Sequence, residues 1–133
     1  MIKEEYKDLP DTEFVPLKEG IDPVLWGKYE INKLGEIKTV ESGKIRKMTS
    51  CKEGRYPKIV LSNQFINKNT KSYYIHRLVA FTFLKKEDES YNYVDHINRN
   101  VLDYSVTNLR WCDREINISN QVRKTVFDRY FSE

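Results

Sequence analysis

The order of apolar and polar positions divides the chain into an irregular arm, a series of short strands, an apolar helix and a mixed C-terminal segment. Residues 1–25 hold Pro10, Pro16 and Pro23, which interrupt helices and strand ladders, so we expect an irregular arm there. From residue 28, β-favouring pieces alternate with turn residues, and KYEI followed by EIKTV predicts a hairpin. Roughly three to five antiparallel strands are expected between residues 28 and 75.

The second half of the chain predicts a helix, two strands and a further helix. HRLVAFTFL, residues 76–84, has no Gly or Pro and is apolar nearly all round, which predicts a short buried helix opened by a capping or core-edge His76. YNYVDHI and LRWC then predict two short strands joined by a polar loop. Asp113 precedes REINISNQVRK, and an aspartate N-cap with Glu115 in the first turn predicts a helix. The residues assigned to the core here are Leu109, Trp111, Ile116, Tyr91 and Tyr93.

The composition describes one globular domain with an uneven charge. A chain of 133 residues with 39% hydrophobic and 32% charged residues can bury a modest core, so a disordered chain and a three-domain chain are excluded. Residues 1–22 carry seven acids and three bases, a net charge of −4, so within the total of +3 residues 23–133 carry +7. A basic body favours a polyanionic partner, because neutralised phosphates release counterions. A solvated surface is the alternative.

The cysteines and histidines do not form a recognisable zinc motif. Cys51 and Cys112 have no CxxC partner, and together with His76 and His96 they show no paired ligand spacing, so two reduced thiols are expected. No apolar N-terminal stretch follows a basic region, and no apolar run reaches about 18 residues, so neither secretion nor membrane spanning is indicated. A cytoplasmic location is therefore expected.

Basic residues are dense in the predicted strands and recur further along the chain. A sheet that presents alternate residues on one face would lay several of them along a duplex backbone. The alternative is the charged solvent face of an ordinary sheet. The residues predicted to contact DNA are Lys44, Arg46, Lys47, Lys52, Arg55, Lys58, Arg77 and Arg99.

Asp95 and His96 are the candidate centre of chemistry. If their strand packs against the following helix, the Asp95 carboxylate and the Asn117 amide oxygen converge, and oxygen ligands suit Mg²⁺, which leaves its other positions to water and phosphate. An imidazole with an unperturbed pKa near 6.5 can take a proton from water beside such a phosphate, which describes phosphodiester hydrolysis. Adjacent strand residues point to opposite faces, so both reach one point only where the strand ends, and Asn98 marks such an end. A surface Asp–His hydrogen bond is the alternative.

Four motifs follow one another at defined intervals: HRLVAFTFL, VDHIN, TNLRW and REINISNQ. Asn108 lies 12 residues after His96, and Asn117 lies 21 residues after it. Their order and spacing resemble the HNH nuclease family, in particular the phage and intron-encoded HNH homing endonucleases in which an asparagine replaces the helical histidine (the H-N-N variant). Upstream, W...YEINKLGEIKTV resembles a module that often precedes this nuclease core. Together the matches cover most of residues 26–121.

The resemblance implies an α+β fold with a ββα-metal core (the HNH or His-Me finger), an N-terminal small antiparallel sheet and a short buried helix. It implies that Asp95 and Asn117 ligate Mg²⁺ or Mn²⁺, that His96 is the general base, and that Asn108 holds the loop and orients the site. The implied activity is a metal-dependent endonuclease that nicks double-stranded DNA. It would act as a monomer on DNA, with a dimer as the alternative, in the bacterial host cell of a phage or mobile element.

The resemblance also predicts a division of the chain: an acidic arm (1–25), a basic β-rich DNA-contacting module (26–75), the nuclease core (76–124) and a C-terminal helical tail (125–133). Relatives commonly have a DGN turn after the histidine and an NN pair a little later, where this chain has NRN and DYS. Asn98 is the residue expected to tolerate left-handed geometry in place of the glycine. VRKTVFDRYFSE is too short for the helix-turn-helix domain of larger relatives, so sequence specificity is expected from the sheet, from a partner or from neither.

A second hypothesis keeps the nuclease scaffold without cleavage. The chain would then be a regulator of phage type that binds nucleic acid or protein. The altered loop, the missing reading domain and the acidic arm motivate it, because the arm would mimic phosphate or cover the basic face. Uptake of a divalent ion separates the two hypotheses.

Overall fold

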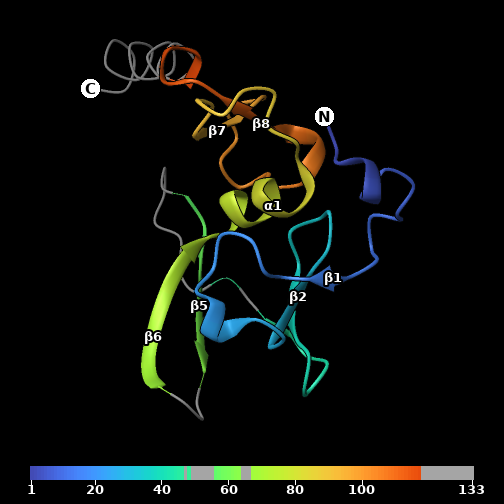
Figure 1. Ribbon diagram of the computed structural model, residues 1–133, viewed down its shortest axis with the longest axis vertical. Helices are drawn as coiled ribbons and strands as arrows, with labels where there is room; N and C mark the ends of the chain where they lie inside the picture. The colour runs from blue at the N-terminus through green and yellow to red at the C-terminus, as the bar shows by residue number, and fades with distance from the viewer. Residues whose placement is uncertain (47, 49–55, 64–66, 118–133) are drawn as a thin grey trace.

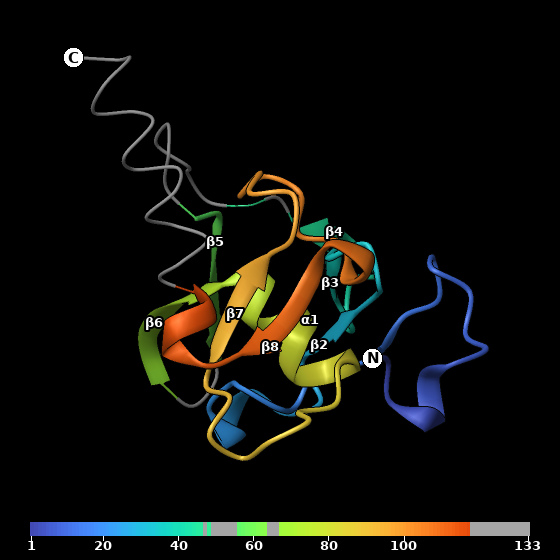
Figure 2. The same cartoon turned by 90° about the horizontal axis from the view of Figure 1, so that it is seen from above.

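A computed structural model describes residues 1–46, 48, 56–63 and 67–117, and it mixes short antiparallel strands with helical segments (Figures 1 and 2). The 3-10 helices are η1 (Glu4–Tyr6), η2 (Pro23–Leu25) and η3 (Val106–Asn108), and the α-helix is α1 (Ile75–Phe83). The strands are β1 (Val15–Pro16), β2 (Tyr29–Ile31), β3 (Ile37–Thr39), β4 (Ile45–Arg46), β5 (Lys58–Asn63), β6 (Asn67–Tyr74), β7 (Tyr93–His96) and β8 (Leu109–Cys112). The α+β class is thereby confirmed.

The strands form three antiparallel groups. β1, β2, β3 and β4 make one sheet in that order, β5 pairs with β6, and β7 pairs with β8. The KYEI and EIKTV hairpin is confirmed as β2 and β3, which pair through Tyr29↔Thr39 and Ile31↔Ile37. The described residues of the upstream β-rich region therefore form two separate sheets. None of the helices in the described part of the chain is long and apolar enough to cross a membrane.

Helix α1 lies at the centre of the molecule, between the β7–β8 hairpin and the upstream strands (Figures 1 and 2). It contains no Gly or Pro, and Leu78, Val79 and Phe83 are at most 1% exposed. His76 is buried as well, at 5% exposed. Since neighbouring elements cover several sides of the helix, its sequence is apolar nearly all round. The predicted short buried helix is confirmed, beginning one residue early.

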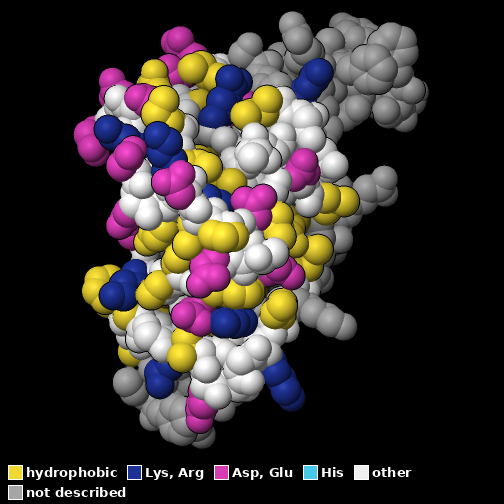
Figure 3. All heavy atoms as spheres, turned by 90° about the vertical axis from the view of Figure 1, so that its right-hand side faces the viewer, with side chains coloured by type: hydrophobic (Ala, Val, Ile, Leu, Met, Phe, Trp, Pro, Cys, Tyr) yellow, Lys and Arg dark blue, Asp and Glu magenta, His cyan; other side chains and the backbone are white. Residues whose placement is uncertain are grey.

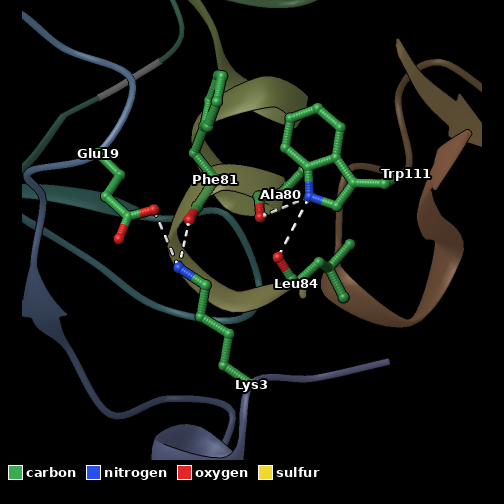
Figure 4. Close-up of polar contacts among 6 residues, drawn as sticks. All are labelled: Lys3, Glu19, Ala80, Phe81, Leu84 and Trp111. Carbon is green, nitrogen blue, oxygen red and sulfur yellow. Dashed lines mark hydrogen bonds and ion pairs between the residues drawn. The ribbon is translucent and has the colours of Figure 1, made fainter. Parts of the chain in front are cut away.

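Side chains from two distant parts of the chain bind the carbonyl groups at the end of α1 (Figure 4). Trp111 of β8 donates from Nε1 to the carbonyl oxygens of Ala80 and Leu84, each at 3.2 Å. Lys3 donates from Nζ to the carbonyl oxygen of Phe81 at 2.8 Å. The carbonyl oxygen of Ala80 also accepts from the backbone N–H of Leu84 at 3.0 Å, whereas the carbonyl groups that follow it lack partners within the helix. These contacts hold the β7–β8 hairpin and the N-terminal arm on the same helix end.

The N-terminal arm is not irregular throughout, which corrects that expectation. Val15 pairs with Ile31, and Pro16 pairs with Glu30, so the arm supplies one of the two edge strands of the four-stranded sheet. An edge strand tolerates proline, because one side of its ladder needs no N–H donor. Figure 3 shows acidic side chains spread over the face on which the arm lies. The arm residues that join the core are Val15, Leu17, Ile21 and Leu25.

The turn between β2 and β3 supports the loop that leads into β8. Asn32 is fully buried and accepts hydrogen bonds on Oδ1 from the backbone of the turn, which fixes its shape. The carbonyl oxygen of Lys33 accepts a bond of 2.9 Å from the backbone N–H of Val106. Gly35 has a φ of +85°, and a Cβ on it would lie 2.3 Å from Cδ1 of Tyr104. The upstream sheet therefore positions the loop.

The assignment of core residues in the second half is confirmed in part. Leu109 and Trp111 are buried at 3% and 7% exposed, and Tyr91 packs against the core while partly buried. Tyr93 and Ile116 were assigned to the core wrongly, since they are 40% and 38% exposed. Tyr93 opens β7 on the face opposite to that of its buried neighbour, because successive strand residues alternate.

Candidate functional site

The β7–β8 hairpin carries the candidate catalytic residues on its first strand. Asp95 lies opposite Arg110 and His96 lies opposite Leu109. Both are buried, Asp95 at 2% and His96 at 4% exposed. Because successive side chains of a strand alternate, Asp95 shares a face with Arg110, whereas His96 shares the other face with Leu109. The two neighbours therefore lie in different surroundings, although His96 is the last residue of β7.

Asp95 forms a buried ion pair with Arg110. The guanidinium donates from Nε at 3.0 Å and from Nη2 at 2.9 Å, both to Oδ2 of the carboxylate. The Asp95 side chain is 3% exposed and that of Arg110 is 49% exposed. A carboxylate taken out of water needs such a charge-assisted partner to remain ionised at low cost.

His96 lies in a cluster of aromatic rings. Its ring centroid is 4.9 Å from that of His76, the first-turn histidine of α1, and 5.5 Å from that of Tyr56, which stacks on it at 15°. Tyr56 also contacts His76 at 4.6 Å, and Tyr74 contacts Tyr56 at 5.9 Å. His76 is a core-edge residue, since α1 has no side-chain cap at its N-terminus. The cluster fixes the plane of the His96 ring.

Burial lowers the pKa of His76 from 6.5 to about 3, with smaller contributions from the nearby His96 and Arg77. Nδ1 of His76 is buried and has no hydrogen-bond partner among the residues that the structure describes. His76 is therefore neutral at physiological pH. At that pH His76 therefore places no positive charge beside the His96 ring.

Asn108 holds the loop that joins the two strands. Its Oδ1 accepts a bond of 3.0 Å from the backbone N–H of Asn98, and its Nδ2 donates to Oδ1 of Asn98 at 2.9 Å and to the carbonyl oxygen of Asp103 at 2.8 Å. Its own carbonyl oxygen accepts from the backbone N–H of Ile97 at 2.8 Å. The side chain thus closes both ends of the loop around the end of β7.

The left-handed residue of this loop is Arg99, with a φ of 63°, and not Asn98, which corrects the expectation. Asn98 is engaged elsewhere: its Oδ1 accepts from the backbone N–H of Asn100 at 2.8 Å, in addition to its bonds with Asn108. The backbone N–H of Arg99 donates to the carbonyl oxygen of His96 at 2.8 Å. Because these side-chain bonds hold Asn98, the left-handed conformation occurs at the next residue, Arg99.

The helix after β8 begins as expected. Oδ1 of Asp113 accepts from the backbone N–H of Ile116 at 2.7 Å, which confirms the aspartate N-cap, and residues 114–117 are helical. Asn117 is half-buried in this first turn. The rest of the expected helix lies outside the described residues. The order strand, loop, strand, helix is thus confirmed, while the convergence of Asn117 with Asp95 stays a prediction.

The basic residues predicted to contact DNA have varied surroundings. Lys44 and Arg46 are exposed at β4, and Arg46 also donates to the carbonyl oxygen of Val60 at 3.2 Å. Arg77 donates to the carbonyl oxygen of Asn92 at 3.3 Å and so braces the segment before β7. Lys58 lies 5.3 Å above the Tyr74 ring, and Arg99 lies at the loop described above. Lys47, Lys52 and Arg55 lie outside the described residues.

Sequence reasoning missed Arg110 and Tyr56 as parts of this site. Arg110 could have been found from the strand pairing, because fixing the loop length places it opposite Asp95. Tyr56 gave no comparable signal, since its contact with His96 joins residues 40 positions apart in the sequence.

The donor groups at the site fit a hard cation in kind. Among the described residues, no group of three or more His, Cys, Asp or Glu side chains could hold a metal ion, so a zinc site of the usual kind has no ligand set there. A buried carboxylate and side-chain amides supply oxygen donors, which suit Mg²⁺ or Mn²⁺ with most positions left to water and substrate.

The comparisons with known proteins agree with this arrangement. The chain belongs to the HNH homing endonuclease family. It is 36% identical over 98 residues to DNA endonuclease I-HmuI of Bacillus phage SP01, across 74% of this chain and 53% of that protein. It is 34% identical over 96 residues to the uncharacterized HNH endonuclease L247 of Acanthamoeba polyphaga mimivirus, across 71% of this chain and 23% of that protein.

A solved structure on DNA binding and cleavage by the HNH homing endonuclease I-HmuI also matches, with a TM-score of 0.68 and 30% identity. The match covers 85% of this chain and 59% of that one. No protein-family model matches the sequence. The chain thus spans about half the length of I-HmuI. Members of this family typically use a divalent metal ion.

Proposed function

We propose that the chain is a metal-dependent DNA endonuclease that hydrolyses phosphodiester bonds and nicks double-stranded DNA. The observation that carries the proposal is the pair of Asp95 and His96 at the end of β7, within a strand, loop, strand and helix. The sequence and structural likeness to I-HmuI supports it. The region from residue 76 to 124 would be the ββα-metal core, and its H-N-N residues would be His96, Asn108 and Asn117.

Asp95 and His96 would act on one phosphate at the end of β7, where neighbouring side chains can reach the same point. Asp95 and Asn117 would hold Mg²⁺ or Mn²⁺, which when bound supplies charge stabilisation on the phosphate and the leaving oxygen. His96 would accept a proton from the attacking water at a ring nitrogen, which is typically worth about 10² to 10⁴ in rate. Asn108 would orient the site through the loop that it closes. The ring cluster would fix the orientation of the base.

The basic β-rich region from residue 26 to 75 would follow the DNA backbone. Its exposed bases at β4 would neutralise phosphates, and a nicking monomer needs one active site per chain. These assignments predict a salt-dependent affinity for DNA that does not require metal.

The test is nicking of supercoiled plasmid with Mg²⁺ or Mn²⁺, with and without chelator. We expect His96→Ala to lose about 10² to 10⁴ in rate while its DNA affinity, measured by fluorescence anisotropy, stays unchanged. Glu19→Gln is the matched control, because it removes an exposed ion pair with Lys3 on the arm. Equal nicking by wild type and His96→Ala would overturn the proposal. DNA binding without metal uptake or nicking would favour the non-catalytic regulator instead.

A further inference from the structure

The ion pair of Asp95 and Arg110 has an unusual distribution of exposure. The carboxylate is 3% exposed, whereas in the other ion pairs between described residues the carboxylates of Glu19 and Glu30 are 62% and 29% exposed. Arg110 projects from β8 with half of its side chain in solvent, and it binds Asp95 from the position directly opposite. The guanidinium of Arg110, which reaches solvent, is thus paired with the carboxylate of Asp95, which does not.

The charges of Asp95 and Arg110 balance each other before any ligand arrives. Asp95 and Arg110 together carry no net charge, so a divalent cation joining them leaves the site with a net charge of about two positive units. In the buried surroundings of Asp95 this excess is poorly screened. A phosphate of the DNA backbone removes part of it, and it also fits the planar donors of a guanidinium.

From this geometry we propose that Arg110 couples cation binding to DNA binding. The inference rests on the proposed function. Without DNA, the guanidinium keeps the buried carboxylate neutralised and disfavours a second cation beside it. With DNA, the solvent-facing part of Arg110 binds a backbone phosphate, and the cation becomes favourable. Arg110 is a positioning residue for Asp95 and a contact residue for DNA.

The coupling has a measurable size and a built-in check. Coupling between two ligands typically changes affinity by about 5- to 150-fold, and the factor is the same in both directions. We therefore expect a DNA duplex to raise Mn²⁺ affinity at least about tenfold, and Mn²⁺ to raise DNA affinity by the same factor. A phosphate that ligates the ion would also couple the two ligands, so the contribution of Arg110 is the part of the coupling that its variants lose.

The experiment is calorimetric titration of Mn²⁺ into chelator-treated protein, with and without a DNA duplex in Ca²⁺-free buffer. Arg110→Gln removes the positive charge. Arg110→Lys keeps the charge but has one nitrogen in place of the two guanidinium nitrogens that contact Asp95. In Arg110→Gln we expect Mn²⁺ affinity without DNA to rise and the coupling factor to fall below that of wild type. Without metal, the slope of log affinity against log salt should decrease by about 1, as for the loss of one phosphate contact. Arg110→Lys should retain most of that slope.

The outcomes separate this inference from the proposed function. If wild type neither takes up Mn²⁺ with DNA nor nicks plasmid, the proposed function fails. If wild type does both, and Arg110→Gln shows the same coupling and the same salt slope, the role of Arg110 is overturned and the function stands. Should Arg110→Gln fail to fold, Arg110→Lys decides, because a single ammonium group cannot hold the carboxylate and a phosphate through separate planar donors. A lowered coupling factor in folded Arg110→Lys supports the role of Arg110, and an unchanged factor overturns it.

Discussion

Protonation of His76 should make folding stability depend strongly on pH. The folded protein holds the pKa of this buried histidine at about 3, whereas the unfolded chain has the ordinary value of 6.5. Between pH 6.5 and 3 the unfolded state therefore binds a proton on His76 that the folded state does not bind. The free energy of unfolding falls as pH falls through this range. Because pH 5 is well above the folded value, the loss between pH 7.5 and 5 amounts to about 2 kcal/mol.

The assay is urea unfolding at several pH values, followed by the fluorescence of the buried Trp111. His76→Phe keeps a ring between Tyr56 and His96 but cannot titrate. Its stability should fall by about 2 kcal/mol less than that of wild type between pH 7.5 and 5. The comparison is repeated in a His96→Gln background, so that titration of the neighbouring ring does not enter the difference. Parallel stability curves for wild type and His76→Phe in both backgrounds would refute the reasoning.

Three further substitutions test how the candidate site is supported. Gly35→Ala should destabilise more than Gly27→Ala, since both glycines have a φ of +85° but only at Gly35 does the new Cβ meet Tyr104; equal midpoints in urea would contradict the contact. Asn108→Ala should cost about 2 to 3 kcal/mol in the same assay, because it removes three side-chain hydrogen bonds and leaves loop groups unpaired; a loss under about 0.5 kcal/mol would argue against its role in the loop. Trp111→Phe keeps an aromatic ring packed against α1 but loses both hydrogen bonds of the indole Nε1. We expect the free energy of unfolding, measured by chemical denaturation, to fall by about 1 to 2 kcal/mol. An unchanged midpoint would show that packing alone holds the hairpin.

The sequence predicted those parts of the fold that depend on local pattern. Helix α1 followed from an apolar run without Gly or Pro, and β7 and β8 followed from β-branched and aromatic residues that flank a polar loop. The cap at Asp113 followed from residue type and position. Each of these signals acts over a few residues, which is why it survives in the folded protein.

Features that depend on tertiary contacts could not be predicted in the same way. The arm was expected to be irregular because of its prolines, but pairing with β2 gives Pro16 an edge position where its missing N–H does no harm. The left-handed residue fell at Arg99 because the side chain of Asn98 is bound to Asn108, ten residues further on. In both cases a distant partner overrode a local preference.

The alternation of β7 explains how two adjacent residues can have different chemical tasks. Asp95 faces the half-exposed guanidinium of Arg110, which a ligand in solvent can reach. His96 faces the uncharged rings of His76 on α1 and of Tyr56. If both side chains pointed the same way, Arg110 would lie beside the imidazole and disfavour its protonated form. The proposed hydrolysis requires both side chains to reach one phosphate, which is possible at the end of β7, where Asn108 holds the loop. A one-residue shift in the β7–β8 register would exchange the faces of the two side chains, so the loop length is as important to the proposed activity as the residues themselves.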